Sequence, residues 1–203
     1  MRWILVRHGI AWDRMAKDCP PDPERPLTLR GMVRTRAAMR GLALQLGREE
    51  LVLASSPYLR AMQSAEIAGE VFCAQREVPG GKLKIHRADA LSPGGDFREL
   101  CDGYPWPRAQ TRILFGHSPD LERFAEHLLQ DIAIKGRHTT SAAEFLKLKK
   151  SGALCIQADS PAGPCRLAWV LPPRQLRELG RLFPDGSMAP VNQKLWAKSE
   201  RAK

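Results

Sequence analysis

The sequence is poor in the features that mark secreted or membrane-bound proteins. Its five cysteines are an odd number and form no Cys-x-x-Cys pair, which argues against a disulfide framework and favours reduced thiols in a cytoplasmic protein. The first apolar run is four residues long and ends at Arg7, so it is too short for a signal peptide. No stretch approaches the length of a transmembrane helix. We therefore expect a soluble protein without membrane contacts.

Motifs for cofactors and nucleic acids are missing as well. There is no His-Glu-x-x-His, no paired cysteines and no acidic cluster at metal-ligand spacing, so we expect neither a metal nor an organic cofactor. The Gly94-Gly95 pair is too sparse for a nucleotide-binding loop. Only two tyrosines occur and the other aromatic residues are scattered, so we expect no surface for stacking bases and no nucleic-acid partner.

The sequence does contain an excess of positive charge. Lys and Arg number 32 against 22 Asp and Glu, a net charge of +10, which favours anionic partners such as phosphorylated proteins or small phosphate substrates. A length of 203 residues with 43% hydrophobic residues suits one domain with its own core. We expect this domain to cover residues 1–183 and residues 184–203 to form a basic tail, in a monomer or weak dimer.

Short apolar runs alternate with helical patterns along the chain. The expected strands cover residues 3–6, 51–54, 83–86, 112–115, 153–158 and 166–171. The expected helices follow Thr28, run from Ser56 to Phe72 and from Ser118 to Gln130, and cover residues 174–183, with loops at 18–26 and 91–108. This alternation predicts an α/β fold, a three-layer α/β/α sandwich with a mostly parallel central sheet.

Capping residues mark the expected helix starts. Thr28 is predicted as the N-cap of a helix whose buried stripe includes Leu29 and Val33. Ser56 and Pro57 are predicted as the N-cap and first residue of the next helix. This start places Arg60 in the first turn, where it can lean toward the end of the preceding strand.

Polar residues follow three of the predicted strands. Residues 7–9 (Arg-His-Gly) follow the first strand, residues 55–60 (Ser-Ser-Pro-Tyr-Leu-Arg) the second and residues 116–119 (Gly-His-Ser-Pro) the fourth. The carboxyl ends of parallel strands meet at one edge of a sheet, where open α/β folds bind ligands. We therefore expect these segments to form one site.

The residue types in these segments suit a phosphoryl group. Guanidinium groups offer forked donors that match phosphate oxygens, and neutral imidazole is a competent nucleophile toward phosphorus. A glycine lets the backbone come close, and a helix start adds free N–H groups. Each residue alone also has a structural interpretation, such as a solvated arginine or a core histidine, but their joint occurrence favours a phosphate site. The candidates are Arg7, His8, Gly9, Arg60, His117 and Ser118.

These segments resemble the three signature motifs of the histidine phosphatase (phosphoglycerate mutase-like) superfamily. The matching residues are 5–9 (Leu-Val-Arg-His-Gly), 55–65 (Ser-Ser-Pro-Tyr-Leu-Arg-Ala-Met-Gln-Ser-Ala) and 116–118 (Gly-His-Ser). Residues 25–28 with Gly31, residues 91–96 and residues 139–142 further resemble the SixA-type phosphohistidine phosphatases. The resemblance extends over about residues 1–171 and implies the fold of that superfamily.

The resemblance also implies a mechanism. His8 would take the phosphoryl group from a phosphohistidine-bearing protein, and water would then hydrolyse phospho-His8 without a metal. Arg7, Arg60 and His117 would bind the phosphoryl oxygens. One departure is Ile10, where many SixA-type proteins have an acidic residue.

Two other functions stay open at the level of sequence. A small-metabolite phosphomonoesterase or mutase of the same superfamily would need a general acid, for which Glu99 is the main candidate and Asp96 and Asp13 are weaker ones. A phosphoprotein-binding module without turnover is the second alternative, and the intact set of His8 and its neighbours argues against it.

Overall fold

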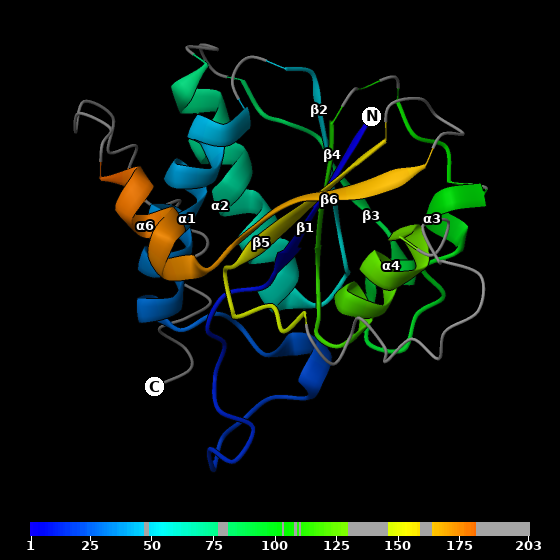
Figure 1. Cartoon of the computed structure of the whole chain (residues 1–203). Helices are drawn as coiled ribbons and strands as arrows, with labels where there is room; N and C mark the ends of the chain where they lie inside the picture. The colour runs from blue at the N-terminus through cyan, green and yellow to red at the C-terminus, as the bar shows by residue number, and fades with distance from the viewer. Residues whose placement is uncertain are drawn as a thin grey trace.

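The computed structural model describes residues 1–46, 49–76, 81–102, 104–107, 109, 111–129, 146–158 and 164–181. Its centre is a six-stranded sheet in the order β3-β2-β4-β1-β5-β6 (Figure 1). The strands are β1 (Arg2–Arg7), β2 (Leu51–Ser55), β3 (Ile85–Arg87), β4 (Thr111–Gly116), β5 (Ala153–Ala158) and β6 (Cys165–Leu171). The first four strands pair in parallel, whereas β5 and β6 are antiparallel, which confirms the predicted mostly parallel sheet.

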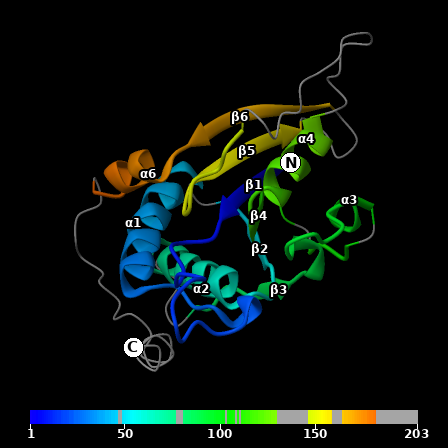
Figure 2. The same ribbon diagram turned by 90° about the horizontal axis from the view of Figure 1, so that it is seen from below.

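Helices cover both faces of the sheet (Figure 2). One layer holds α1 (Leu29–Leu46), α2 (Leu59–Gln75) and α6 (Pro173–Gly180), and the other holds α3 (Glu99–Asp102) and α4 (Asp120–Leu129). Two short 3-10 helices, η1 (Asp22–Glu24) and η2 (Asp89–Leu91), lie in the connections. The predicted three-layer α/β/α sandwich is therefore confirmed.

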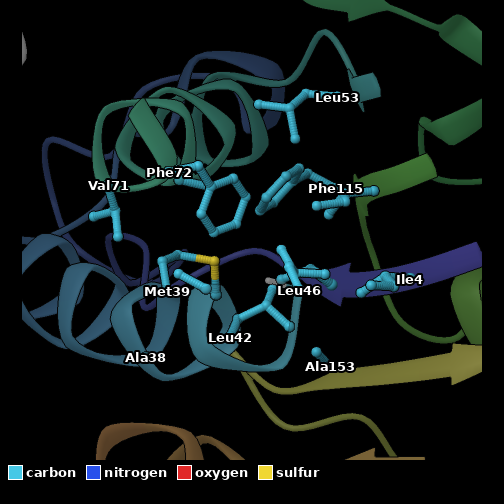
Figure 3. Close-up of a cluster of buried hydrophobic side chains, with 14 of the residues drawn as sticks. Ile4, Ala38, Met39, Leu42, Leu46, Leu53, Val71, Phe72, Phe115 and Ala153 are labelled. Atoms are coloured by element: carbon cyan, nitrogen blue, oxygen red, sulfur yellow. The ribbon is translucent and has the colours of Figure 1, made fainter. Parts of the chain in front are cut away.

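Strand β1 is apolar throughout because both of its faces are covered. Successive side chains of a strand point to opposite faces, so Ile4 packs toward α1 and α2 while Trp3 and Leu5 pack toward α4. Figure 3 shows Ile4 and Phe115 beside the side chains of α1 and α2. These two clusters hold the carboxyl ends of β1 and β4 side by side.

Helix α1 begins where predicted, but fewer of its apolar side chains are buried than the sequence predicts. The Gly31 amide donates to Thr28 Oγ1 at 3.0 Å, which confirms the cap. Leu29 and Val33 are 45% and 57% exposed, so their predicted burial is wrong. The covered face is the one that carries Met32, and Val33 is turned about 100° away from it on a helix with 3.6 residues per turn.

The start of α2 lies two residues later than predicted. Tyr58 is the N-cap and the helix begins at Leu59, whereas Ser56 and Pro57 continue the chain away from β2. The Ser56 hydroxyl accepts the Tyr58 amide at 3.3 Å, a local turn that competes with helix. Arg60 is still in the first turn of the helix, as predicted.

Other local predictions are corrected in the same way. Helix α4 begins at Asp120, after a cis Ser118–Pro119 bond, so Ser118 does not open it. The segments predicted as loops contain η1 and α3. Residues 139–142, the end of the last predicted helix and the basic tail 184–203 lie outside the described residues. Within the described part, no helix is long and apolar enough to cross a membrane.

Candidate active site

Three elements bring the predicted site residues to one edge of the sheet. Arg7 ends β1 and pairs in register with Gly116, which ends β4, so His8 and His117 each follow their strand by one residue. The His8 amide donates to the Gly116 carbonyl at 3.1 Å, which ties the two strand ends together. Arg60 reaches the same place from the first turn of α2.

The hydrogen bonds of His8 define its tautomer. Nδ1 lies 2.7 Å from the carbonyl oxygen of Gly9, which can only accept, so Nδ1 carries the proton. Nε2 therefore holds the lone pair and accepts a hydrogen bond from Arg60 Nε at 3.3 Å. Because the side chain is buried, with 7% of the residue exposed, this lone pair is held in one direction.

His117 faces His8 with the two ring centroids 5.1 Å apart. Its Nδ1 accepts a hydrogen bond from Arg60 Nη2 at 3.3 Å, so its Nε2 carries the proton and donates to Ser56 Oγ at 3.0 Å. The Tyr58 ring packs edge-on against the imidazole. The lone pairs of both histidines thus point to one guanidinium group.

Both imidazoles are neutral at physiological pH. Burial, the neighbouring His117 and the positive charges of Arg60 and Arg7 together lower the pKa of His8 to about 2, against the hydrogen bond to Gly9, which raises it. Burial and the positive charges of Arg60, Arg7 and Arg14 together lower the pKa of His117 to about 3, against the opposing charge of Asp22. A neutral imidazole keeps the lone pair that a nucleophile requires.

The guanidinium of Arg60 is shared between the histidines and Asp22. Nη1 donates to the Asp22 carbonyl at 2.6 Å and Nη2 to Asp22 Oδ2 at 3.1 Å, while Arg25 Nε donates to Oδ1 at 2.8 Å. Burial raises the pKa of Asp22, but the hydrogen bond from Arg25 and the charge of Arg60 outweigh it and the pKa lies below its ordinary value. The Asp22 carboxylate therefore accepts hydrogen bonds from guanidinium N–H groups of a kind that also match phosphate oxygens.

A second acidic residue stands behind Arg7. Arg7 Nη1 donates to the Leu148 carbonyl at 2.8 Å, and Glu122, which is 2% exposed, accepts from Ser118 Oγ at 2.6 Å and from the Leu148 amide at 2.9 Å. Burial lowers the pKa of Arg7, and the charge of Glu122 opposes that effect. Among the described residues, Arg7 Nε and Glu122 Oε2 are buried without a hydrogen-bond partner.

Gly9 fits tightly between β1 and the helices. Its amide donates to Ser64 Oγ at 3.0 Å, and that hydroxyl donates to the Arg60 carbonyl at 2.7 Å. A Cβ on Gly9 would lie 2.3 Å from Thr35 Oγ1, closer than real contacts allow. A glycine is therefore required where the loop behind the His8 imidazole packs on α1.

Not every predicted candidate reaches the site. The Ser118 hydroxyl is turned toward Glu122, and its predicted role with phosphate stays untested. Asp96 and Asp13 are exposed and accept hydrogen bonds from nearby backbone amides. Glu99 is exposed in α3. Within the described residues, these three carboxylates form no hydrogen bond or ion pair with His8 or His117.

The site includes residues that the sequence did not single out. Asp22 and Glu122 contact the arginines or their neighbours, and Ser56 and Ser64 fix the imidazole of His117 and the loop of His8. The spacing of Asp22 and Arg25, three residues apart, was an available signal for a pair. Among the described residues there is no group of three or more His, Cys, Asp or Glu that could hold a metal ion.

Neither a protein-family model nor a curated protein sequence matches the chain, but solved structures do. The protein histidine phosphatase SixA complexed with tungstate superposes with a TM-score of 0.65, covering 87% of this chain and 99% of that chain at 22% identity. The chain has the histidine phosphatase fold.

Solved structures of phosphatases with other substrates share the histidine phosphatase fold. A phosphoserine phosphatase from Entamoeba histolytica, in complex with 3-phosphoglyceric acid, matches with a TM-score of 0.55 and 16% identity over 86% of this chain and 98% of that chain. A mycobacterial glucosyl-3-phosphoglycerate phosphatase complexed with VO3 matches with a TM-score of 0.58 and 14% identity, over 84% of this chain and 99% of that chain. The substrate must therefore be inferred from the site itself.

Proposed function

We propose that this protein is a metal-independent phosphatase that hydrolyses phosphohistidine through a covalent phospho-His8 intermediate. The observation that carries the proposal is the neutral, buried His8, whose Nε2 lone pair lies 3.3 Å from Arg60 Nε. The neutral imidazole of His117 faces His8 with the ring centroids 5.1 Å apart, and the charge of Arg7 acts on His8. This set supplies both a nucleophile and donors for phosphoryl oxygens.

The proposed reaction has two displacements at phosphorus. Nε2 of His8 forms a bond to phosphorus while the P–N bond of the substrate breaks. The substrate phosphohistidine enters protonated on its other ring nitrogen, so its imidazole leaves as the neutral base, and phospho-His8 keeps the proton on Nδ1. Water then attacks phosphorus and gives a proton to solvent, and the P–Nε2 bond breaks to release inorganic phosphate and the neutral His8 imidazole. Arg7, Arg60 and His117 bind the oxygens on which charge is distributed in both transition states.

The surroundings of the site favour phosphohistidine over an alkyl phosphate. An alkoxide is a poor leaving group and normally needs a positioned acid, whereas imidazole leaves readily once it is protonated. The candidate acids Asp96 and Glu99 are exposed and have no contact with His8 among the described hydrogen bonds and ion pairs. The excess of positive charge also favours docking of an acidic phosphoprotein.

Trapping the intermediate tests the nucleophile. Enzyme that is denatured in base during turnover of a ³²P-phosphohistidine peptide should carry an acid-labile, base-stable label, and His8→Ala should lose it. His127→Ala, a histidine on α4 outside the site, is the control and should keep the label. A label on another residue would refute the assignment.

A substrate panel separates the proposal from the metabolite alternative. We expect clear preference for the phosphohistidine peptide and for p-nitrophenyl phosphate over phosphoserine and sugar phosphates, with full activity in chelator. Glu99→Gln should leave all rates unchanged. Efficient hydrolysis of an alkyl phosphate that Glu99→Gln abolishes would instead make the protein a phosphomonoesterase, and binding of phosphopeptide without turnover would make it a binding module.

A further inference from the structure

A basic groove adjoins the site on the side of α1 and α6. Its volume is about 510 Å³, and it is bounded by the chain after β1, by α1, by the segment before β5 and by the start of α6, elements that lie together in Figure 2. Arg7 lines one end of the groove. The other lining residues are Ile10, Arg34, Lys149, Lys150, Ser151, Pro172, Pro173, Arg174 and Arg177.

The charges along this groove are almost all positive. Arg174 pairs with Glu178 at 3.0 Å, but among the described residues no ion pair involves Arg34, Lys149, Lys150 or Arg177. The cations also act on one another. Partial burial of its side chain lowers the pKa of Lys150, as do the charges of Arg7, Arg25 and Arg14, against the opposing charge of Asp13.

Cations also lie close to one another around Arg177 in the groove. Burial lowers the pKa of Arg177, and the charges of Arg34, Arg181 and Arg174 lower it further, against Glu178 alone. Mutual repulsion of this kind is relieved when an anion binds between the cations. Cationic lining residues are therefore present from Arg7, beside His8, to Arg177 in the middle of α6.

We propose that this groove binds an acidic stretch of the phosphoprotein substrate, next to the phosphohistidine that enters the active site. This inference rests on the proposed function and names its substrate class: a phosphohistidine flanked by Asp and Glu. The carboxylates of the bound segment lie against Arg34, Lys149 and Arg177, and its phosphohistidine reaches His8 past Arg7.

The shape and composition of the groove fit a peptide better than a compact polyanion. Its cations come from four separate segments, and Lys149, Lys150 and Arg174 are exposed, so they suit several carboxylates rather than one enclosed group. Between them lie Ile10, Pro172 and Pro173, which offer apolar contact to an extended backbone. In such a backbone, side chains on one face recur every 6–7 Å or so, which spreads the charges along the groove.

Two matched peptides and two matched double variants test the inference. One phosphohistidine peptide carries Asp and Glu beside the histidine and the other carries Asn and Gln at the same positions. In Lys149→Gln/Arg177→Gln, kcat/KM for the acidic peptide should fall about 5- to 30-fold, since one exposed and one half-buried charge pair are lost. The rates for the neutral peptide and p-nitrophenyl phosphate should not change. Lys82→Gln/Lys84→Gln, which removes the same charge near β3 at the other edge of the sheet, should behave as wild type.

Equal losses in both double variants would overturn the inference, because net charge alone would then explain the preference. If wild type hydrolyses neither peptide, the proposed function fails, and fluorescence anisotropy with unphosphorylated acidic and neutral peptides decides on the groove. Tighter binding of the acidic peptide, lost in Lys149→Gln/Arg177→Gln, supports it, and equal binding of both overturns it. Inorganic tripolyphosphate bound at the groove in place of the acidic peptide would also overturn it.

Discussion

Asp22 holds the guanidinium group of Arg60 in place through two hydrogen bonds. Its carboxylate and carbonyl oxygens accept hydrogen bonds from Nη2 and Nη1 of Arg60, the same donors that are proposed to bind phosphoryl oxygens. A carboxylate at this point orients the guanidinium, but it also repels an incoming anion. We therefore expect Asp22 to improve the orientation of the Arg60 guanidinium and to weaken the binding of anions.

We predict that Asp22→Asn binds inorganic phosphate more tightly and turns over more slowly. Removing the negative charge should lower the inhibition constant for phosphate about two- to fivefold, as for other half-exposed charges. The less firmly held Arg60 should reduce kcat for p-nitrophenyl phosphate. Steady-state kinetics with phosphate as competing inhibitor measures both effects.

Glu24→Gln removes an exposed acid from the same 3-10 helix and is the matched control. Its phosphate inhibition constant and kcat should stay at the wild-type values. Should Asp22→Asn instead weaken phosphate inhibition, the carboxylate would be helping to bind the anion, and the proposed competition with it would be wrong.

Site residues that lie in a local sequence motif could be predicted, whereas those that act through contacts distant in the sequence could not. Arg7, His8, Arg60 and His117 belong to short motifs at strand ends, so local patterns place them at one edge of the sheet. Asp22 gives no such local signal for its contact with Arg60, because 38 residues separate the two. Glu122 is likewise buried only through the fold of the segment around Leu148.

At the scale of elements, the loop after β1 packs so closely on helix α1 that no Cβ fits at Gly9. We predict that Gly9→Ala lowers the free energy of unfolding by about 1–3 kcal/mol, as overpacking in a core does. The new Cβ would be 2.3 Å from Thr35 Oγ1, whose side chain is short and fully buried. Urea denaturation of the variant measures the loss.

Gly69→Ala provides the comparison for the same chemical change. A Cβ there would meet its nearest neighbours at 3.6 and 4.0 Å, which is ordinary contact, and alanine has the higher helix propensity in α2. Gly69→Ala should therefore be neutral or stabilising. In a double-mutant cycle, Thr35→Ala should make Gly9→Ala less costly; strictly additive effects would mean that Thr35 is not the source of the strain.

Element boundaries were harder to predict than the elements themselves. Every expected strand is present: β1 and β4 are buried apolar runs, and the edge strands β3 and β6 are found as well although they are partly exposed. The start of α2 was misplaced because Ser56 and Pro57 have the chemistry of a helix start, whereas the Ser56 hydroxyl contacts the Tyr58 amide and His117. A local capping pattern cannot predict a contact with His117, which is 61 residues away in the sequence.

At the scale of the whole molecule, the two buried imidazoles make stability depend on pH. Their pKa values in the folded protein are about 2 and about 3, whereas an unfolded histidine titrates near about 6.5. Between these values the unfolded chain binds more protons than the folded one. Stability from this source is complete above about pH 6.5 and is lost as the pH falls.

We predict that His117→Gln weakens this dependence. Between pH 6 and 5, its free energy of unfolding should fall less steeply than that of wild type, by up to about 1.4 kcal/mol per pH unit, the value for one proton. The double variant His8→Gln/His117→Gln should be flatter still. Urea titrations at several pH values give the slopes, and a double variant as steep as wild type would show that other groups cause the acid sensitivity.

The overall class of the fold was predictable, but its strand order was not. Alternating strands and helices imply a mostly parallel sheet with helices on both faces, and the structure contains such a sheet. The order β3-β2-β4-β1-β5-β6 depends on which apolar faces meet at long range. The antiparallel pairing of β5 with β1 places Ser151 beside the carbonyls of Arg7 and His8, a contact without a local signal.

Consecutive side chains of α2 have a consequence for engineering. Gln63 Oε1 accepts the Leu27 amide at 2.7 Å, and Ser64 Oγ accepts the Gly9 amide at 3.0 Å, one turn after Arg60 on the same helix. The chain segments on both sides of the site are thus fastened to the element that carries its guanidinium. Redesign aimed at new substrates should leave this turn of α2 intact and vary the surrounding loops, because the reacting groups would then keep their mutual alignment.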